Sequence, residues 1–250
     1  AGPYPMNAEG PEENHIKPHV EGTLRVLKAA KKNNIKRVIL TSSAAAIWMG
    51  VPGDEDLDET KWTDPERKNV PPYQKGKTLG EKAAWDFVSK NDSIQLTSIL
   101  PSVVLGPGIG RPVRRGSLEF FMMLINKEMP VAPPFKVGLV DVRDVAEMHI
   151  AALENDKSIG KRIIVTENTY WVKDFCKMLN DIGHNAPTFS PPVFLVKFMA
   201  NFDKTIKPIK PLLGVDLNFN TEPAKNILNY QPIPIRDTIK DTSNYLKDMS

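Results

Sequence analysis

The sequence predicts an α/β fold whose sheet is mostly parallel. Short runs of branched apolar residues, at 37–40 and 96–100, are typical of strands buried on both faces of a parallel sheet. Helical patterns separate these runs at intervals that require right-handed crossovers. With 250 residues, 41% hydrophobic content and 25% charged residues, the chain has an ordinary globular composition. It is long enough for one large domain, or for one domain with a small lobe.

The first elements follow from apolar spacing and from the residues that interrupt it. In chain order we expect a helix over 16–33 that ends at Asn33-Asn34, a strand over 37–40 that stops at Thr41-Ser42-Ser43, a surface excursion over 50–72, and a helix from Tyr73 that ends at Asn91-Asp92. The last helix carries Gly76, Gly80 and Ala84 on one face, which should allow close packing against a neighbour.

The second half alternates in the same way and then becomes helical. We expect a strand over 96–100, a loop over 103–110, a helix over 118–125, a strand over 137–142, a helix capped by Asp144 that runs to Glu154, a strand over 161–165 and a helix over 173–182. Prolines cluster beyond Pro187, where helices over 193–205 and 235–247 are expected to form a lobe over the carboxyl end of the sheet.

Composition excludes several classes of protein. The formal charge of +3 is small and scattered, so no nucleic-acid partner is expected. Cys176 is the single cysteine, which favours a reducing compartment, and we expect a cytoplasmic protein. No apolar run approaches the roughly 20 residues of a membrane span, and no targeting signal is visible. His15 and His19 share a helical face without a third ligand, so no metal site is expected.

Tyr73 and Lys77 are the candidates for chemistry. A tyrosine has an ordinary pKa of about 10, and a nearby ammonium lowers this value because it favours the phenolate. The spacing of four residues puts both side chains on one helical face. A serine at a neighbouring strand end would hold a substrate oxygen against the tyrosine, which is the geometry of a carbonyl reductase. We expect the strand ends at Ser43, Pro101 and Asp141 to align at one sheet edge, where open α/β sheets bind ligands.

Four ordered motifs show a resemblance to a known family. They are Arg37-Val-Ile-Leu-Thr-Ser-Ser-Ala-Ala-Ala-Ile47, Tyr73-Gln-Lys-Gly-Lys-Thr-Leu-Gly-Glu-Lys-Ala-Ala-Trp-Asp-Phe87, Leu100-Pro-Ser-Val-Val-Leu-Gly-Pro107 and Val140-Asp-Val-Arg-Asp-Val-Ala146. The chain resembles an extended short-chain dehydrogenase/reductase of the NAD-dependent epimerase/dehydratase superfamily, near the dihydroflavonol, cinnamoyl-CoA and aldehyde reductases. The resemblance implies a doubly wound Rossmann-like domain over 1–168, with a substrate-lobe excursion at about 108–136, and a mostly helical substrate lobe over 169–250.

The resemblance also implies residue roles. Tyr73 would give the proton to the substrate oxygen, Lys77 would tune Tyr73 and hold the nicotinamide ribose, and Ser43 would bind the carbonyl oxygen, with Ser42 as its competitor. The cofactor would be NADP, or else NAD. The further residues implied in cofactor binding are Ala1, Gly2, Pro3, Ser42, Pro101 and Val103, and packing at a strand end explains the last two equally well.

The front of the chain departs from the family pattern. The Gly-x-x-Gly-x-x-Gly loop that brings the backbone to the pyrophosphate does not occur in the sequence. Gly106, Gly108 and Gly110 have the wrong spacing and are expected to form a turn. We therefore expect the N-terminal strands, about 60 to 80 residues, to be missing before Ala1, so that these 250 residues are a fragment without turnover of its own.

Several other side chains have competing interpretations. Arg111, Arg114 and Arg115 could hold a phosphate or carboxylate of the substrate, but a solvated loop is favoured. His149 is expected to be structural. An apolar substrate pocket and ordinary core packing explain equally well the aromatic residues Trp48, Phe120, Phe121, Phe194 and Phe198.

The sequence and this resemblance thus predict an NAD(P)H-dependent oxidoreductase that reduces an aldehyde or ketone, as a monomer or homodimer. One alternative is a sugar-nucleotide epimerase or a 3-beta-hydroxysteroid dehydrogenase/isomerase-like enzyme, in which the same three residues act with a tightly held cofactor. Another is a non-catalytic protein that senses dinucleotides or binds partners.

Overall fold

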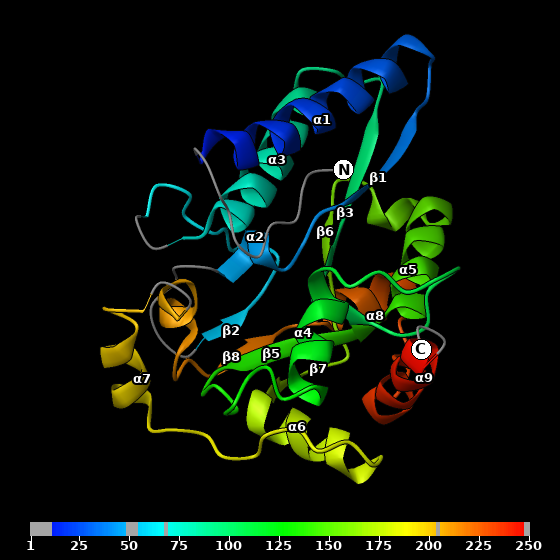
Figure 1. Cartoon of the computed structure of the whole chain (residues 1–250). Helices are drawn as coiled ribbons and strands as arrows, with labels where there is room; N and C mark the ends of the chain where they lie inside the picture. The colour runs from blue at the N-terminus through cyan, green and yellow to red at the C-terminus, as the bar shows by residue number, and fades with distance from the viewer. Residues whose placement is uncertain (1–11, 49–54, 68–69, 204–205, 248–250) are drawn as a thin grey trace.

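The central layer is a parallel sheet between two helical layers (Figure 1). The structure, a computed structural model, describes residues 12–48, 55–67, 70–203 and 206–247. The sheet has the order β1-β3-β6, from β1 (Arg37–Thr41), β3 (Gln95–Pro101) and β6 (Arg162–Val165). The register pairs Thr41 with Ile99 and Ser98 with Arg162, both in parallel. The predicted parallel α/β architecture is therefore confirmed.

Two long helices cover one face of this sheet. The helices α1 (Glu13–Lys32) and α3 (Pro72–Ser89) lie side by side, and a core of Leu27, Ala84, Ile94 and Leu96 joins them to the strands. Pro72 is the first residue of α3, where its missing N–H costs no helical hydrogen bond. Both helices match the sequence expectation closely.

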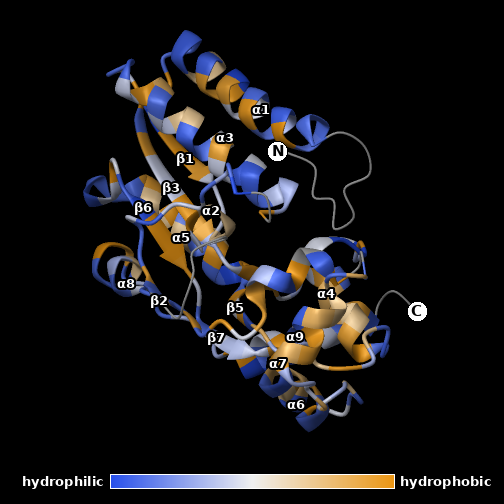
Figure 2. Cartoon of the chain, turned by 90° about the vertical axis from the view of Figure 1, so that its left-hand side faces the viewer, coloured by the Kyte–Doolittle hydropathy of each residue, from blue (hydrophilic) through white to orange (hydrophobic). Residues whose placement is uncertain are grey.

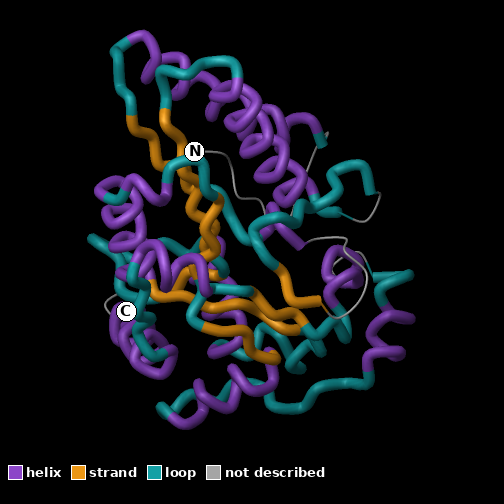
Figure 3. Tube along the Cα trace, turned by 180° about the vertical axis from the view of Figure 1, so that it is seen from behind, coloured by secondary structure: helices purple, strands orange, loops and turns teal. Residues whose placement is uncertain are grey.

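The opposite face is covered by α5 (Val142–Glu154) and α8 (Glu222–Leu228). Ile99, Met148 and Ile163 are buried in the core between these helices and the sheet. Figure 2 shows hydrophobic residues on the strands, most plainly on β6, and Figure 3 shows from behind that the strands lie inside a layer of helices. The sheet is thus wound on both sides.

A second group of elements has its own core. It contains β4 (Val103–Leu105), β5 (Lys136–Asp141) and β7 (Asn168–Trp171), in the order β4-β5-β7, where β4 is parallel and β7 antiparallel to β5. Its helices are α4 (Gly116–Ile125), α6 (Val172–Asp181), α7 (Val193–Met199) and α9 (Ile235–Lys247). Phe121, Phe175 and Ile239 are fully buried among them. Two 3₁₀ turns, Asp156–Ser158 and Lys207–Leu212, complete the elements of this half of the chain.

Several short elements were not predicted from the sequence. The strand β4 lies at Val103–Leu105, where a loop over 103–110 was expected, and neither β7 nor α8 was expected. The residues expected to form an irregular excursion contain the strand β2 (Glu55–Leu57), which pairs in parallel with β8 (Leu217–Phe219). The helix α2 (Ala45–Trp48) follows β1 directly. Elements of three or four residues show no readable period, and pairing with a distant segment decides whether they form.

The expected cap of α5 was wrong. The helix begins at Val142, and the cap is Asp141, whose carboxylate accepts from the backbone N–H of Arg143 at 2.8 Å. Asp144 is buried instead and accepts from the N–H of Ile233 at 3.0 Å. The chain passes from β5 into α5 without a loop, so the last strand residue is also the cap.

The expected sheet edge also needs correction. Asp141 ends β5, which belongs to the sheet with β4 and not to the one that ends at Ser43 and Pro101. Its carboxylate binds Arg143 and Thr238. In addition, residues 37–40 of β1 are half-buried and not buried as expected, because within the described ranges β1 pairs with β3 alone.

The helix expected over 193–205 is shorter than predicted, since α7 ends at Met199. The other long helices lie within a few residues of their expected bounds. Among the described residues, no helix combines the length and apolar character needed to cross a membrane.

Candidate functional site

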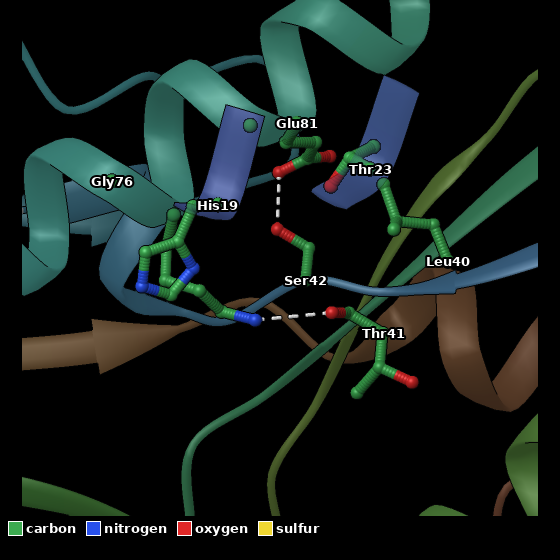
Figure 4. Close-up of a pocket in the computed structure, with 9 residues that line it drawn as sticks. His19, Thr23, Leu40, Thr41, Ser42, Gly76 and Glu81 are labelled. Carbon is green, nitrogen blue, oxygen red and sulfur yellow. Dashed lines mark hydrogen bonds between the residues drawn. The ribbon is translucent and has the colours of Figure 1, made fainter. Parts of the chain in front are cut away.

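Lys77 connects α3 to the carboxyl end of β1. Its ammonium donates to the carbonyl oxygen of Thr41 at 3.1 Å, and Figure 4 marks this bond with a dashed line. The two residues are 36 positions apart in the chain. The structure therefore places the lysine predicted from the sequence at the strand end where the predicted serines lie.

The surroundings of Lys77 act on its charge in opposite directions. Burial lowers the pKa of the ammonium, because removal from water penalises the charged form. The carboxylate of Glu81, one turn further along α3, opposes this shift by raising the pKa. The pKa of Lys77 is lowered overall, so its ammonium releases a proton more readily than that of an exposed lysine, and its charged form favours a nearby phenolate.

Tyr73 lies one helical turn before Lys77 and is half-buried. Its ring meets the ring of His19 on α1 edge-on, with 5.8 Å between the centroids. His19 fits there because Gly76 has no side chain: a Cβ at Gly76 would lie 2.6 Å from Cδ2 of the imidazole. The small-residue face of α3, expected to allow close packing, does so against α1 (Figure 4).

The two serines after β1 have different environments. Ser42 is buried, and its hydroxyl donates to Oε2 of Glu81 at 2.6 Å. Ser43 is half-buried, and its hydroxyl accepts from the backbone N–H of Ala45 at 3.2 Å, at the start of α2. The structure thus commits the Ser42 hydroxyl to a carboxylate of α3, whereas the bond to Ser43 uses one acceptor site and leaves its proton to be donated.

Pro101 and Val103 lie beside this strand end. The carbonyl oxygen of Pro101, at the end of β3, accepts from the N–H of Ala44 at 2.9 Å. Val103 begins β4 and is paired with Leu139. Both positions are compatible with packing as well as with cofactor contact. Ala1, Gly2 and Pro3, the other predicted cofactor residues, lie outside the described residues.

A small cavity lies between α1, β1 and α3, and Figure 4 shows its lining. His19, Thr41, Ser42, Lys77 and Glu81 contribute polar atoms to it. Its volume is about 30 Å³, which suits a single water molecule and is far too small for a nicotinamide ring. Among the described residues, the cavity is therefore too small to enclose the nicotinamide by itself.

Other candidates from the sequence lie in structural roles. Arg114 forms an ion pair with Glu128 on the surface. His149 contacts the Thr41 hydroxyl through Nε2 at 2.7 Å and the Val145 carbonyl through Nδ1 at 2.7 Å. Gly106 and Gly110 have positive φ, consistent with the expected turn.

The aromatic residues considered for a substrate pocket divide into two groups. Phe121 is fully buried in the core of the second group of elements, and Phe120 packs on Phe175. Trp48, the last residue of α2, is partly buried and packs against the core that contains Ile47 and Leu57. Phe194 and Phe198 on α7 are exposed. Over the described ranges, His, Cys, Asp and Glu side chains nowhere gather in groups of three that could hold a metal ion.

The buried carboxylate of Glu81 and its partner Arg162 were not predicted from the sequence. Nε of Arg162 donates to Oε1 of Glu81 at 2.8 Å, and the guanidinium stacks on Trp62 at 3.5 Å from the ring centroid. The spacing of Glu81 four residues after Lys77 was a signal that it faces the same way. No local signal indicates Arg162, which comes from β6, 81 positions away.

The chain is similar to several known proteins. Residues 4–166 match the family model described as the NAD dependent epimerase/dehydratase family. A cinnamoyl-CoA reductase of Medicago truncatula is 34% identical over 255 residues, covering 99% of this chain and 72% of that protein. An NADPH-dependent methylglyoxal reductase of Saccharomyces cerevisiae is 32% identical, covering 98% of this chain and 74% of the relative.

Solved structures of reductases have a similar fold. The yeast methylglyoxal/isovaleraldehyde reductase Gre2, complexed with NADPH, superposes with a TM-score of 0.76 at 26% identity, covering all of this chain and 75% of that one. The predicted Rossmann-like fold is confirmed by this likeness. The resemblance to reductases stated from four sequence motifs is confirmed by the relatives. The chain belongs to the NAD dependent epimerase/dehydratase family, in the part of it that contains NADPH-dependent reductases.

Proposed function

We propose that this protein is an oxidoreductase that reduces an aldehyde or ketone with NADPH. The observation that carries the proposal is the bond from Lys77 to the Thr41 carbonyl. It brings the helical face of Tyr73 and Lys77 against the strand end that carries Ser43. The reductases among the relatives support the same chemistry.

In this proposal Tyr73 is the proton donor. A phenol with an ordinary pKa of about 10 is a weak acid at neutral pH. A lysine ammonium one helical turn away stabilises the phenolate left after the proton has moved to the substrate oxygen. Ser43 binds the same oxygen by donating its hydroxyl proton, and so orients the carbonyl group.

The residues present fit one part of the cofactor. The half-buried ammonium of Lys77 at a strand end suits a ribose hydroxyl, and Pro101 and Val103 would flank the nicotinamide. Ser42 is less well suited to this contact, because its hydroxyl already donates to Glu81. When bound, the reduced nicotinamide supplies the hydride. Cofactor contacts of Ala1, Gly2 and Pro3 remain part of the proposal.

Replacement of Tyr73 tests the proposal directly. With the full-length protein that carries this sequence, oxidation of NADPH is followed by absorbance against a panel of aldehydes and ketones. We expect Tyr73→Phe to lower kcat by about 10²–10⁴-fold, the usual contribution of a general acid, while NADPH binding remains. Tyr245→Phe, on α9, is the matched control and should keep its activity. Turnover of Tyr73→Phe at the wild-type rate would refute the role.

Dialysis adds a second measurement. A reductase exchanges its cofactor in every turnover, so we expect NADPH to be lost on dialysis. A cofactor that stays bound and is not consumed would instead indicate the epimerase type of chemistry.

We also propose the division into a cofactor domain over 1–168, with an excursion at about 108–136, and a substrate lobe over 169–250. The separate core around Phe121 and Phe175 supports such a lobe. A monomer or homodimer and a cytoplasmic location complete the proposal. Light scattering after gel filtration and cell fractionation measure these two properties.

A further inference from the structure

Glu81 is fully buried, and it connects three elements. Oε2 accepts from the Ser42 hydroxyl, after β1, at 2.6 Å. Oε1 accepts from Nε of Arg162, on β6, at 2.8 Å and from the indole N–H of Trp85, on α3, at 3.2 Å. The side chain of Glu81 has no exposed surface, and that of Arg162 is 9% exposed. A carboxylate in such a place needs all of these partners, because burial of a charge is costly.

Arg162 is itself held in a fixed position. Its guanidinium lies 3.5 Å from the ring centroid of Trp62 and donates to the carbonyl oxygens of Glu59 and Lys61 at 2.6 and 2.7 Å. Its planar donors suit several fixed acceptors at once. Arg162 therefore anchors Glu81 to β6, which is the strand next to β3 in the described sheet.

Ser42 lies between two residues of the proposed site. The carbonyl of Thr41, on one side, accepts from Lys77, and Ser43, on the other side, carries the hydroxyl proposed to bind substrate. Figure 4 shows the bond from Ser42 to Glu81 next to the bond that ends at Thr41. Fixing Ser42 thus fixes the backbone at both neighbours.

We propose that Glu81 is a positioning residue, which holds α3 in register with the end of β1 through Ser42, so that Tyr73 and Lys77 face Ser43. This inference rests on the proposed function. Displacement of a reacting group by 1 Å can lower a rate by about 10²-fold. A bond that fixes the strand end relative to the helix therefore has a catalytic effect as well as a structural one.

Stability alone does not account for this arrangement. Apolar side chains of similar volume often stabilise a core as well as a buried ion pair does. A directional bond of 2.6 Å from the strand end to the helix instead specifies one relative position. Burial lowers the pKa of Lys77, and the charge of Glu81 partly opposes this lowering, which is consistent with a carboxylate close to the ammonium.

The test uses Ser42→Ala in the full-length protein. This change removes the bond to the strand end and leaves Glu81 paired with Arg162. We expect kcat to fall by about 10- to 100-fold, at a temperature where circular dichroism shows the variant to be folded. The matched control is Trp85→Phe, which removes a bond to the same carboxylate but none to β1, and its kcat should stay close to wild type. An equal effect of the two changes on kcat would overturn the proposal.

A second readout does not depend on turnover. Brief acetylation with acetic anhydride, followed by mass spectrometry, measures the reactivity of Lys77 relative to the exposed Lys90, the residue that follows the same helix. We expect Lys77 to become several-fold more reactive in Ser42→Ala and in Glu81→Gln, because its position and its charge are less well fixed. If wild-type protein reduces no carbonyl compound, the proposed function fails, but the labelling still tests whether the bond from Ser42 to Glu81 fixes the position of Lys77. Unchanged labelling of Lys77 in Ser42→Ala would refute the positioning role of Glu81.

Discussion

Replacement of Arg162 by methionine should cost this fold a large share of its stability. The change leaves the carboxylate of Glu81 buried, with the hydroxyl of Ser42 and the indole of Trp85 as its remaining partners. Loss of one member of a buried ion pair typically costs about 3–5 kcal/mol, out of the 5–15 kcal/mol by which a typical domain is stable. For a domain of this size, each kcal/mol lowers Tm by about 2–4 °C, so we expect a decrease of about 6–20 °C.

Urea unfolding followed by tryptophan fluorescence measures the effect, since Trp62 and Trp85 both contact the pair. The matched control is Arg114→Met, which removes an ion pair whose side chains are 38% exposed; exposed pairs contribute at most about 1 kcal/mol. The double variant Arg162→Met/Glu81→Leu should recover part of the loss, because no unpaired charge remains. If Arg162→Met costs no more than Arg114→Met, the reasoning about burial is wrong.

Three further predictions concern other parts of the molecule. Gly76→Ala places a Cβ 2.6 Å from the His19 ring. The overpacking should cost about 1–3 kcal/mol, which exceeds the gain in helix propensity of about 1 kcal/mol, so we expect the urea midpoint to fall. Adding His19→Ala to the same chain should remove the clash and restore part of the lost stability. Burial, and to a smaller extent Lys247, lowers the pKa of His184, so the neutral ring is favoured in the fold. Its stabilising effect is present above about pH 6.5 and is lost as the pH falls through the lowered pKa; His184→Gln should flatten the pH dependence of unfolding between pH 5 and pH 7, and an unchanged slope would contradict this. Phe198→Ser on α7 changes a side chain that is 62% exposed. It should alter the free energy of unfolding by less than about 0.5 kcal/mol and should lower the fluorescence of a bound hydrophobic dye. A large loss of stability would show instead that the residue is packed.

The sequence alone was sufficient to predict the long elements and to place Tyr73 and Lys77 on one face of a helix. Periodic spacing predicted α1 and α3, and branched runs predicted β1 and β3, because long helices and buried strands repeat one local pattern many times. The spacing of Tyr73 and Lys77 on one helical face follows from helix geometry, which does not depend on the rest of the fold.

Only the tertiary structure decided which partners these elements meet. It showed that β5 ends in a different sheet from β1, that Asp141 and not Asp144 caps α5, and that β2 pairs with β8. It also gave two adjacent serines different partners, since Ser42 donates to Glu81 and Ser43 accepts from the N–H of Ala45. These outcomes depend on contacts between residues far apart in the chain, such as Glu81 with Arg162, and on burial, which sets the strength of such contacts and leaves no local pattern in a sequence.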